Sequence, residues 1–326
     1  MQATVLILGA KGRFGLATAR AFAAAGWNVV GHVRAGAAVP PEEAGDHRIR
    51  WLHADLFDTA ALAQAAQAMS AKERVDVVVH ALNPAYTNAA WTTQVLPMTD
   101  AAIALARALN ATLMVPGNVY NFGAEMPPEL REATVQQAQT VKGRIRIEME
   151  ERMRQSGVHS VVIRAGDFFG AGRGTWFDQV IVKKLGKGVF TYPGPLDIAT
   201  AWAYLPDLAQ TFVEVANRRS PLDRFTVFHF AGHCVSAHQW LATLAPVAQA
   251  RGWLKQGALL RYKTLPWGII RLGAPWVAAW GGLLEMRYLW TTPHRLVNEG
   301  LVGFLGAEPH TALDLAAARA LYDLEP

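Results

Sequence analysis

Short apolar segments alternate with helix-prone segments through the first half of the chain. Runs of mostly branched apolar residues predict strands at residues 4–8, 28–33, 49–52, 75–80, 112–115 and 160–164. Alanine-rich or charged stretches between them predict helices that cover residues 13–25, 59–69, 100–109 and 142–155. Because the strands are apolar throughout, they fit a parallel sheet with helices on both faces. The pattern predicts an α/β fold, a Rossmann-type doubly wound sheet with its ligand at the carboxyl ends of the strands.

The second half of the chain has a different pattern. A glycine-rich stretch at residues 170–174 ends the alternation, and the β-prone residues 225–230 are expected to return to the sheet. Ser236 and Gln239 have the spacing of a capping box, and the remaining residues are tryptophan-rich and helix-prone. We therefore predict a dinucleotide-binding domain and a smaller, mostly helical substrate domain. Their expected limits are residues 1–170, with 204–232 returning, for the first, and residues 171–203 and 233–326 for the second.

One long apolar stretch, residues 265–290, raises the question of a membrane span. Charged residues interrupt it at Arg271, Glu285 and Arg287. Its longest uncharged piece, residues 272–284, is too short for a bilayer, which requires about 20 residues. We expect buried helices of the second domain here, and no membrane partner.

Composition narrows the class of protein further. With 52% hydrophobic and 17% charged residues in 326, the chain has enough apolar material for a large core, which excludes a disordered protein. The net charge of +5 comes from scattered basic residues rather than a stripe, so no nucleic-acid partner is predicted. The single cysteine, Cys234, excludes an internal disulfide, and no histidine spacing indicates a metal site. The first residues lack the layout of a signal peptide, so we predict a cytoplasmic protein.

A glycine motif of the form GxxGxxG follows the first predicted strand directly and opens the first helix. In a dinucleotide site the first glycine makes the tight turn, and the second lets the backbone approach a pyrophosphate. The third lets helix and strand pack closely, while the helix N-terminus attracts the anion. The predicted cofactor loop comprises Gly9, Lys11, Gly12, Arg13, Phe14 and Gly15.

The end of the second strand indicates which nucleotide is preferred. An NAD site usually has an acidic residue there, whereas this strand ends in Arg34, which can bind a 2′-phosphate through two hydrogen bonds. NADP(H) is therefore predicted, with NAD(H) as the other option. Asp55 and Leu56 follow the third strand on the adenine side, and Ala81 and Asn83 follow the fourth strand beside the cofactor.

These motifs together resemble the extended short-chain dehydrogenase/reductases, the group of the nucleoside-diphosphate-sugar epimerases and dehydratases. The resemblance covers nearly the whole chain and implies an NAD(P)-dependent enzyme, with a homodimer as a further expectation. Besides the glycine loop, four segments carry it: residues 54–56 (ADL), 119–120 (VY), 164–170 (RAGDFFG) and 204–209 (YLPDLA).

The chain departs from this family at the catalytic pair Tyr-x-x-x-Lys. The resemblance places the lysine at Lys142, but Ala138 stands four residues earlier, and none of the seven tyrosines has a lysine four residues later. Lys142 is predicted to contact the nicotinamide ribose, or else to be an exposed lysine on a helix with i,i+4 charge pairs. Tyr120 and Asn118 are the nearest candidates to replace the missing acid, unless Tyr120 is a packed aromatic residue.

On the substrate side, Asp167 stands where the family has an asparagine near the substrate phosphates. A carboxylate there repels a diphosphate, and Arg173 is a candidate to offset that repulsion. Phe168 and Tyr204 are candidates for an apolar pocket, with core packing as the alternative for each.

The sequence thus predicts an NADP(H)-dependent oxidoreductase or epimerase-like enzyme that acts on a small carbonyl or alcohol. A sugar-nucleotide-like substrate stays open. The alternative is a non-catalytic NADP(H)-binding regulator or redox sensor, because the catalytic pair is degenerate.

Overall fold

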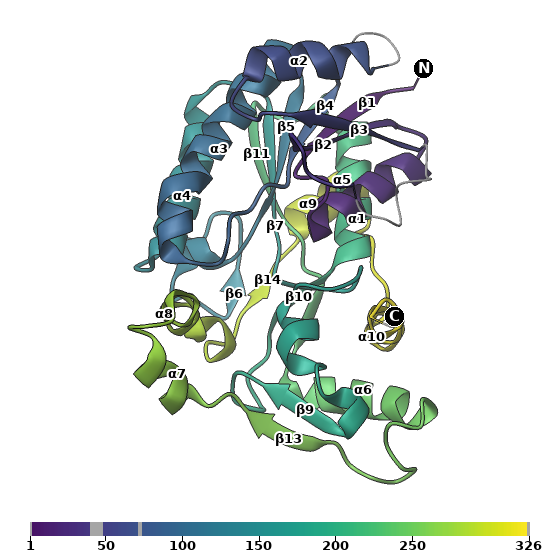
Figure 1. Ribbon diagram of the computed structural model, residues 1–326, viewed down its shortest axis with the longest axis vertical. Helices are drawn as coiled ribbons and strands as arrows, with labels where there is room; N and C mark the ends of the chain where they lie inside the picture. The colour runs from purple at the N-terminus through teal and green to yellow at the C-terminus, as the bar shows by residue number, and fades with distance from the viewer. Residues whose placement is uncertain (1, 40–47, 71–73, 325–326) are drawn as a thin grey trace.

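The fold is built on one seven-stranded parallel sheet. A computed structural model describes residues 2–39, 48–70 and 74–324 (Figure 1). The strands lie in the order β11-β7-β5-β4-β1-β2-β3, and every neighbouring pair is parallel. This arrangement confirms the predicted doubly wound α/β fold. The strands are β1 (Thr4–Leu8), β2 (Asn28–Arg34), β3 (Ile49–Ala54), β4 (Val77–His80), β5 (Thr112–Gly117), β7 (Ser160–Arg164) and β11 (Phe225–His229).

Helices cover both faces of this sheet, because successive strand residues point to opposite sides. Val5 and Ile7 of β1 belong to the core under one group of helices, and Leu6 and Leu8 belong to the core under the other. Figure 1 shows the two groups on opposite sides of the sheet. One group is α1 (Arg13–Ala24), α5 (Leu205–Arg218) and α9 (Glu299–Leu305), and the other is α2 (Thr59–Ala68), α3 (Asn88–Leu109) and α4 (Val141–Gln155).

Local capping explains where the helices begin. The Asp58 side chain, rather than Thr59, caps α2 by accepting from the Ala61 amide. Thr87 caps α3 by accepting from the Ala90 amide, so the helix that contains the predicted residues 100–109 already begins at Asn88. Ser236 forms the expected capping box at the start of α6 (Ala237–Ala250).

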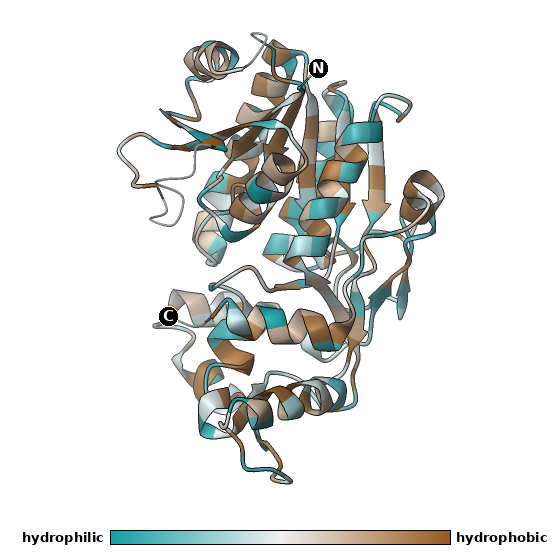
Figure 2. Ribbon diagram, turned by 90° about the vertical axis from the view of Figure 1, so that its right-hand side faces the viewer, coloured by the Kyte–Doolittle hydropathy of each residue, from teal (hydrophilic) through white to brown (hydrophobic). Residues whose placement is uncertain are grey.

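The remaining residues form a second layered region beyond the carboxyl edge of the sheet (Figure 1). This region contains three small sheets, so it is less helical than the sequence suggested. The strands of the large sheet are dominated by hydrophobic residues, as Figure 2 shows. The small sheets pair β8 (Asp167–Phe169), β10 (Thr200–Tyr204) and β12 (His233–Val235); β9 (Val189–Tyr192) and β13 (Arg261–Thr264); and β6 (Glu129–Leu130) and β14 (Arg295–Leu296). The helical elements include η3 (Phe177–Ile181), α7 (Trp267–Gly273), α8 (Ala278–Glu285), η5 (Arg287–Trp290) and α10 (Leu313–Tyr322).

The apolar stretch at residues 265–290 folds as α7, α8 and η5. Among the described residues, no helix has the length and hydrophobicity needed to cross a bilayer. The expectation of buried helices is wrong for α7, however. Ile270 alone is buried there, while Ile269 and Leu272 are largely exposed.

Candidate active site at the carboxyl edge of the sheet

The glycine loop has the backbone geometry that a diphosphate requires. Gly9 has a φ of +78°, which favours glycine, and a Cβ on Gly15 would lie 2.3 Å from the Gly9 carbonyl oxygen. Gly12 caps α1 without any side-chain hydrogen bond. The first turn of α1 is thus free to receive an anion at its positive end.

A cavity of about 490 Å³ lies next to this loop, at the carboxyl ends of the parallel strands. Its wall joins residues that are far apart in the sequence, which is the expected place for a ligand in a doubly wound sheet. Among the residues predicted for the site, the cavity brings together Phe14, Ala81, Asn83, Asn118, Tyr120, Asp167 and Phe168.

Two tyrosine hydroxyls meet at the cavity wall. The Oη atoms of Tyr86 and Tyr120 are 3.3 Å apart, and Asn118 Oδ1 accepts from the Tyr120 amide at 3.0 Å. Burial, and next the charge of Asp167, raise the pKa of Tyr120 to about 12. Tyr120 is therefore a neutral phenol near pH 7, able to donate a proton or a hydrogen bond.

Asp167 supplies a carboxyl group to the same wall. Burial raises its pKa to about 6, against the opposing effect of the Trp290 indole, which donates to Oδ2 at 3.1 Å. A carboxyl group that titrates close to neutral pH inside a cavity is typical of functional sites.

Lys142, the predicted ribose contact, does not line this cavity. Its Nζ donates to Asn88 Oδ1, lies 3.8 Å from Glu285 Oε2 and sits 4.6 Å above the Tyr86 ring. A buried ammonium group needs such partners, and here they hold it behind the cavity wall. Burial also lowers the pKa of Lys142, with Glu285 opposing the shift. The predicted role of Lys142 therefore does not fit this geometry.

Arg146, one turn further along α4, is the cation on the cavity wall. Its guanidinium lies 5.1 Å from the Trp91 ring centroid, and its Nε finds no hydrogen-bond partner in the described parts of the chain. Glu150, four residues further along α4, does not pair with Arg146 but binds Arg164 at 2.6 Å. The i,i+4 spacing from Lys142 was the signal that could have identified Arg146.

Arg13, predicted for the cofactor, turns toward the second region. Its Nη1 donates to the Gly170 carbonyl oxygen at 3.2 Å, and Nη2 lies 3.5 Å from Asp178 Oδ1. Burial lowers the pKa of Arg13 to about 10. Arg13 thus links the glycine loop to the segment that contains η3.

The remaining cofactor predictions lie on the outer part of the carboxyl edge. Lys11 and Arg34 are exposed, and Asp55 is exposed with its Oδ1 accepting from the Phe57 amide at 3.0 Å. Leu56 is buried next to Asp55. Arg34 at the end of β2 remains accessible to a ligand.

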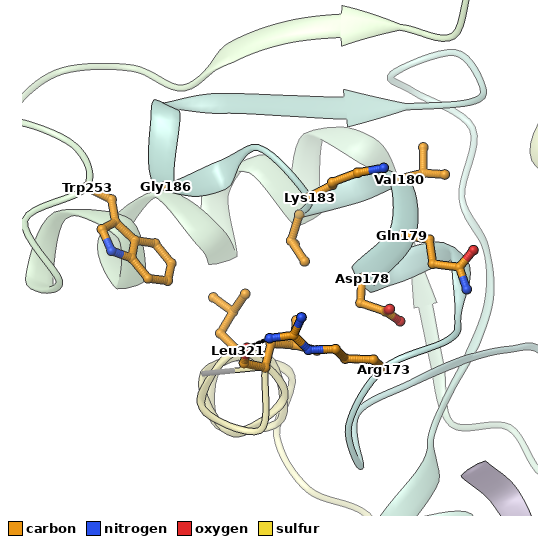
Figure 3. Close-up of a pocket in the computed structure, with 10 residues that line it drawn as sticks. Arg173, Asp178, Gln179, Val180, Lys183, Gly186, Trp253 and Leu321 are labelled. Atoms are coloured by element: carbon orange, nitrogen blue, oxygen red, sulfur yellow. Dashed lines mark hydrogen bonds between the residues drawn. The ribbon is translucent and has the colours of Figure 1, made fainter. Parts of the chain in front are cut away.

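Two predicted substrate residues lie away from Asp167. Tyr204 is buried in the core, its ring centroid 5.3 Å from that of Phe169, so the alternative of core packing holds for it. Arg173 Nη2 donates to the Leu324 carbonyl oxygen at 2.6 Å and lines a second cavity of about 640 Å³ (Figure 3). That cavity is larger, but it lies between η3 and α10 and contains none of the glycine-loop residues. Arg173 therefore does not offset the charge of Asp167.

These features define a dinucleotide-binding fold of the short-chain dehydrogenase/reductase type. The model of the RmlD substrate binding domain family matches residues 3–250, and the chain belongs to this family. Its membership agrees with the resemblance to NAD(P)-dependent epimerases and dehydratases. No curated protein matches the sequence.

Several solved structures share this fold over nearly their full length. Bordetella bronchiseptica WbmH, in complex with NAD⁺, is 17% identical with a TM-score of 0.73, over 99% of this chain and 98% of that chain. UDP-glucose 4-epimerase from Brucella ovis, in complex with NAD, is 14% identical with a TM-score of 0.73, over 99% of each chain. L-threonine 3-dehydrogenase from Trypanosoma brucei is 16% identical with a TM-score of 0.72, over 99% of this chain and 97% of that chain.

Proposed function

We propose that this protein is an NADP(H)-dependent oxidoreductase or epimerase-like enzyme that acts on a small, mainly apolar carbonyl or alcohol. The observation that carries the proposal is the composition of the 490 Å³ cavity. One wall comes from the glycine-loop helix and the end of β4, and the other presents Tyr120 and Asp167. A nicotinamide dinucleotide is supported by the known NAD complexes of proteins with the same fold.

The residues present fit that cofactor. The glycine loop would hold the diphosphate, because no side chain caps the N-terminus of α1 at Gly12. Gly15 has no Cβ, so the first turn of α1 can pack against Gly9. Arg34 would bind the 2′-phosphate of NADP(H), since it is exposed and β2 ends without an acidic residue. When bound, the nicotinamide supplies the redox chemistry, and the protein supplies position and protons.

Tyr120 is the proposed proton donor to the substrate oxygen. Tyr120 lines the cavity, and Tyr86 Oη, 3.3 Å from Tyr120 Oη, is placed to return a proton to it. Asn118 holds the turn that presents Tyr120 through its bond to the Tyr120 amide. Arg146 opposes the rise in the pKa of Tyr120 and so makes the phenol a better acid.

The cavity favours an apolar substrate over a nucleotide sugar. Most of its substrate side is formed by Trp91, Phe168, Trp176, Trp280 and Leu283. Arg146 is the one cation on this wall among the described residues, and Asp167 would repel a diphosphate when ionised.

The test is a steady-state assay of NADPH oxidation with a panel of small aliphatic and aromatic aldehydes and ketones. Tyr120→Phe should lower kcat by about 10²- to 10⁴-fold while NADPH binding stays unchanged. Tyr322→Phe, at an exposed position, is the matched control. Turnover that survives in Tyr120→Phe would contradict the role of Tyr120.

A second candidate function is a non-catalytic NADP(H)-binding regulator. The position of Lys142 behind the cavity wall favours this candidate. Lys142 is the residue predicted to contact the nicotinamide ribose, but its Nζ is held by Asn88 and Glu285 instead. Tight NADPH binding without turnover of any carbonyl in the panel would support this candidate over the enzyme.

A further inference from the structure

One segment of the second region, residues 255–276, combines exposed apolar side chains with exposed basic ones. The apolar members are Leu259, Ile269, Leu272 and Trp276, with exposed fractions of 85%, 63%, 73% and 79%. The basic members are Lys255, Arg261, Lys263 and Arg271, all of them exposed. We call these eight residues the basic apolar face.

The face belongs to one continuous substructure. Tyr262 Oη of β13 donates to the Gly194 carbonyl oxygen at 3.3 Å, and Trp267 Nε1 of α7 donates to the Pro193 carbonyl oxygen at 2.9 Å. Both elements are thereby anchored on the same turn. Figure 1 shows α7 and β13 at the end of the molecule opposite the large sheet.

The charge of this segment is of one sign. No aspartate or glutamate occurs between Asp223 and Glu285. The four basic residues of the face form no ion pair with any residue that the structure describes. Their positive charge is therefore available to an anionic partner.

We propose that the basic apolar face docks on a membrane surface that contains anionic phospholipid. Exposed Trp, Leu and Ile side chains insert at the boundary between headgroups and acyl chains, while Lys and Arg bind the anionic headgroups. Since α7 and α8 are short, they would lie on the bilayer rather than cross it. This proposal is an alternative to the sequence-based expectation that the protein has no membrane partner.

Charge argues against a second copy of the chain as the occupant. Two identical faces packed together would bring four cations of one copy against four of the other, with no acidic residue of the same segment between them. Arg261 and Lys263 also lie on β13, which pairs only with β9 among the described strands. Charged residues on such an edge discourage strand pairing between molecules.

Docking would bring the lipid surface close to the cavity. The α8 helix follows directly after Trp276 and Val277, and its Trp280 and Leu283 line the cavity wall. This consequence rests on the proposed function, whereas the docking surface itself does not.

The test is co-sedimentation of the full chain with vesicles, at low and at high ionic strength. One vesicle contains phosphatidylcholine and phosphatidylglycerol in equal parts, and the other contains phosphatidylcholine alone. We expect binding to the anionic vesicle that weakens as salt is raised. Lys263→Glu changes the charge of the surface by two units. Since each unit of charge near the membrane contributes about fivefold, the partition constant should fall roughly 25-fold. Leu272→Ser combined with Trp276→Ala should lower it by more than about tenfold.

Matched variants on other surfaces are Val135→Ser, at 72% exposure, and Arg74→Glu. Both should bind vesicles as the unchanged protein does, and calorimetric NADPH binding should be the same in all variants. Failure of the unchanged protein to bind the anionic vesicle, or equal binding to phosphatidylcholine alone, would overturn the proposal. A dimer in sedimentation velocity that Trp276→Ala dissociates would also overturn it, because a second copy would then cover the face.

Discussion

The two walls of the cavity are built on different principles. The cofactor wall depends on backbone geometry, as at Gly9 and Gly15, where φ or the lack of space requires glycine. The substrate wall depends on side chains, and there Arg146 and Asp167 stand in an arrangement unlike the Tyr-x-x-x-Lys pattern. A fold can thus keep a dinucleotide site through a few backbone positions while the chemistry opposite that site changes.

The largest effect is expected at the cofactor wall. Gly15→Ala would place a Cβ 2.3 Å from a backbone oxygen, so the loop must shift. We expect at least a 100-fold loss of NADPH affinity in calorimetric titration, because the first turn of α1 moves away from the diphosphate. Gly303→Ala in α9 is the control, since no atom lies within 4 Å of its Cβ position. Unchanged affinity in Gly15→Ala would mean that the loop does not hold the cofactor.

The two cations of α4 should differ sharply in their effects. Arg146→Met should lower kcat about 100-fold with little change in stability, because this side chain faces the cavity. Lys142→Met should leave kcat within a few-fold and reduce the free energy of unfolding by about 1–3 kcal/mol, as Glu285 loses a partner. Kinetics and urea unfolding of both variants check this. The opposite pattern would return the catalytic role to Lys142.

Asp167 predicts a pH dependence for the substrate wall. Its pKa is about 6, and its charge raises the pKa of Tyr120. Tyr120 is thus a better acid when Asp167 is protonated, and kcat for carbonyl reduction should rise up to about tenfold as pH falls through 6. Asp167→Asn should remove this step from the pH profile. A step that persists in Asp167→Asn belongs to another group.

Substitutions in the two walls should also change the pH dependence of stability in opposite directions. The expected changes in Tm are a few degrees. The pKa of Asp167 is raised from 3.8 to about 6. The contribution of Asp167 to the free energy of unfolding is therefore full below pH 3.8 and is lost as pH rises through 6. Burial lowers the pKa of His80 from 6.5 to about 3. The contribution of His80 to the free energy of unfolding is therefore present above pH 6.5 and is lost as pH falls through 3. Asp167→Asn should therefore raise Tm relative to the unchanged protein above pH 6 but not near pH 4.

The matching variant at the cofactor wall is His80→Gln. It should flatten the decline in Tm below pH 6.5. Thermal unfolding across pH 4–8 compares the two variants with the unchanged protein. Parallel Tm curves for all three proteins would show that neither group is coupled to folding.

The parts that could be predicted from sequence are those set by local chemistry. The glycine loop follows β1 directly, and the Ser236 capping box spans four residues, so neighbouring positions were sufficient. Which of Lys142 and Arg146 faces the cavity depends on Asn88 and Glu285, which come from distant parts of the chain. Their contacts carry no local signal.

Burial in the second region was equally hard to predict. Both Tyr204 and Arg173 were candidates for the substrate side, yet Tyr204 enters the core and Arg173 donates to the Leu324 carbonyl oxygen near the C-terminus. The apolar residues of α7 indicated a buried helix, but Ile270 is its one buried residue, and Trp267 is only partly buried against the same cluster. Apolar sequence alone does not distinguish a buried helix from an exposed apolar face.

The most direct test of the NADP(H) site is a calorimetric titration of the protein with NADPH and NADH, repeated with Arg34→Ala. The account predicts that NADPH binds at least about tenfold more tightly than NADH, and that Arg34→Ala removes this preference while NADH affinity stays unchanged. No binding of either nucleotide, or a preference that survives in Arg34→Ala, would contradict it.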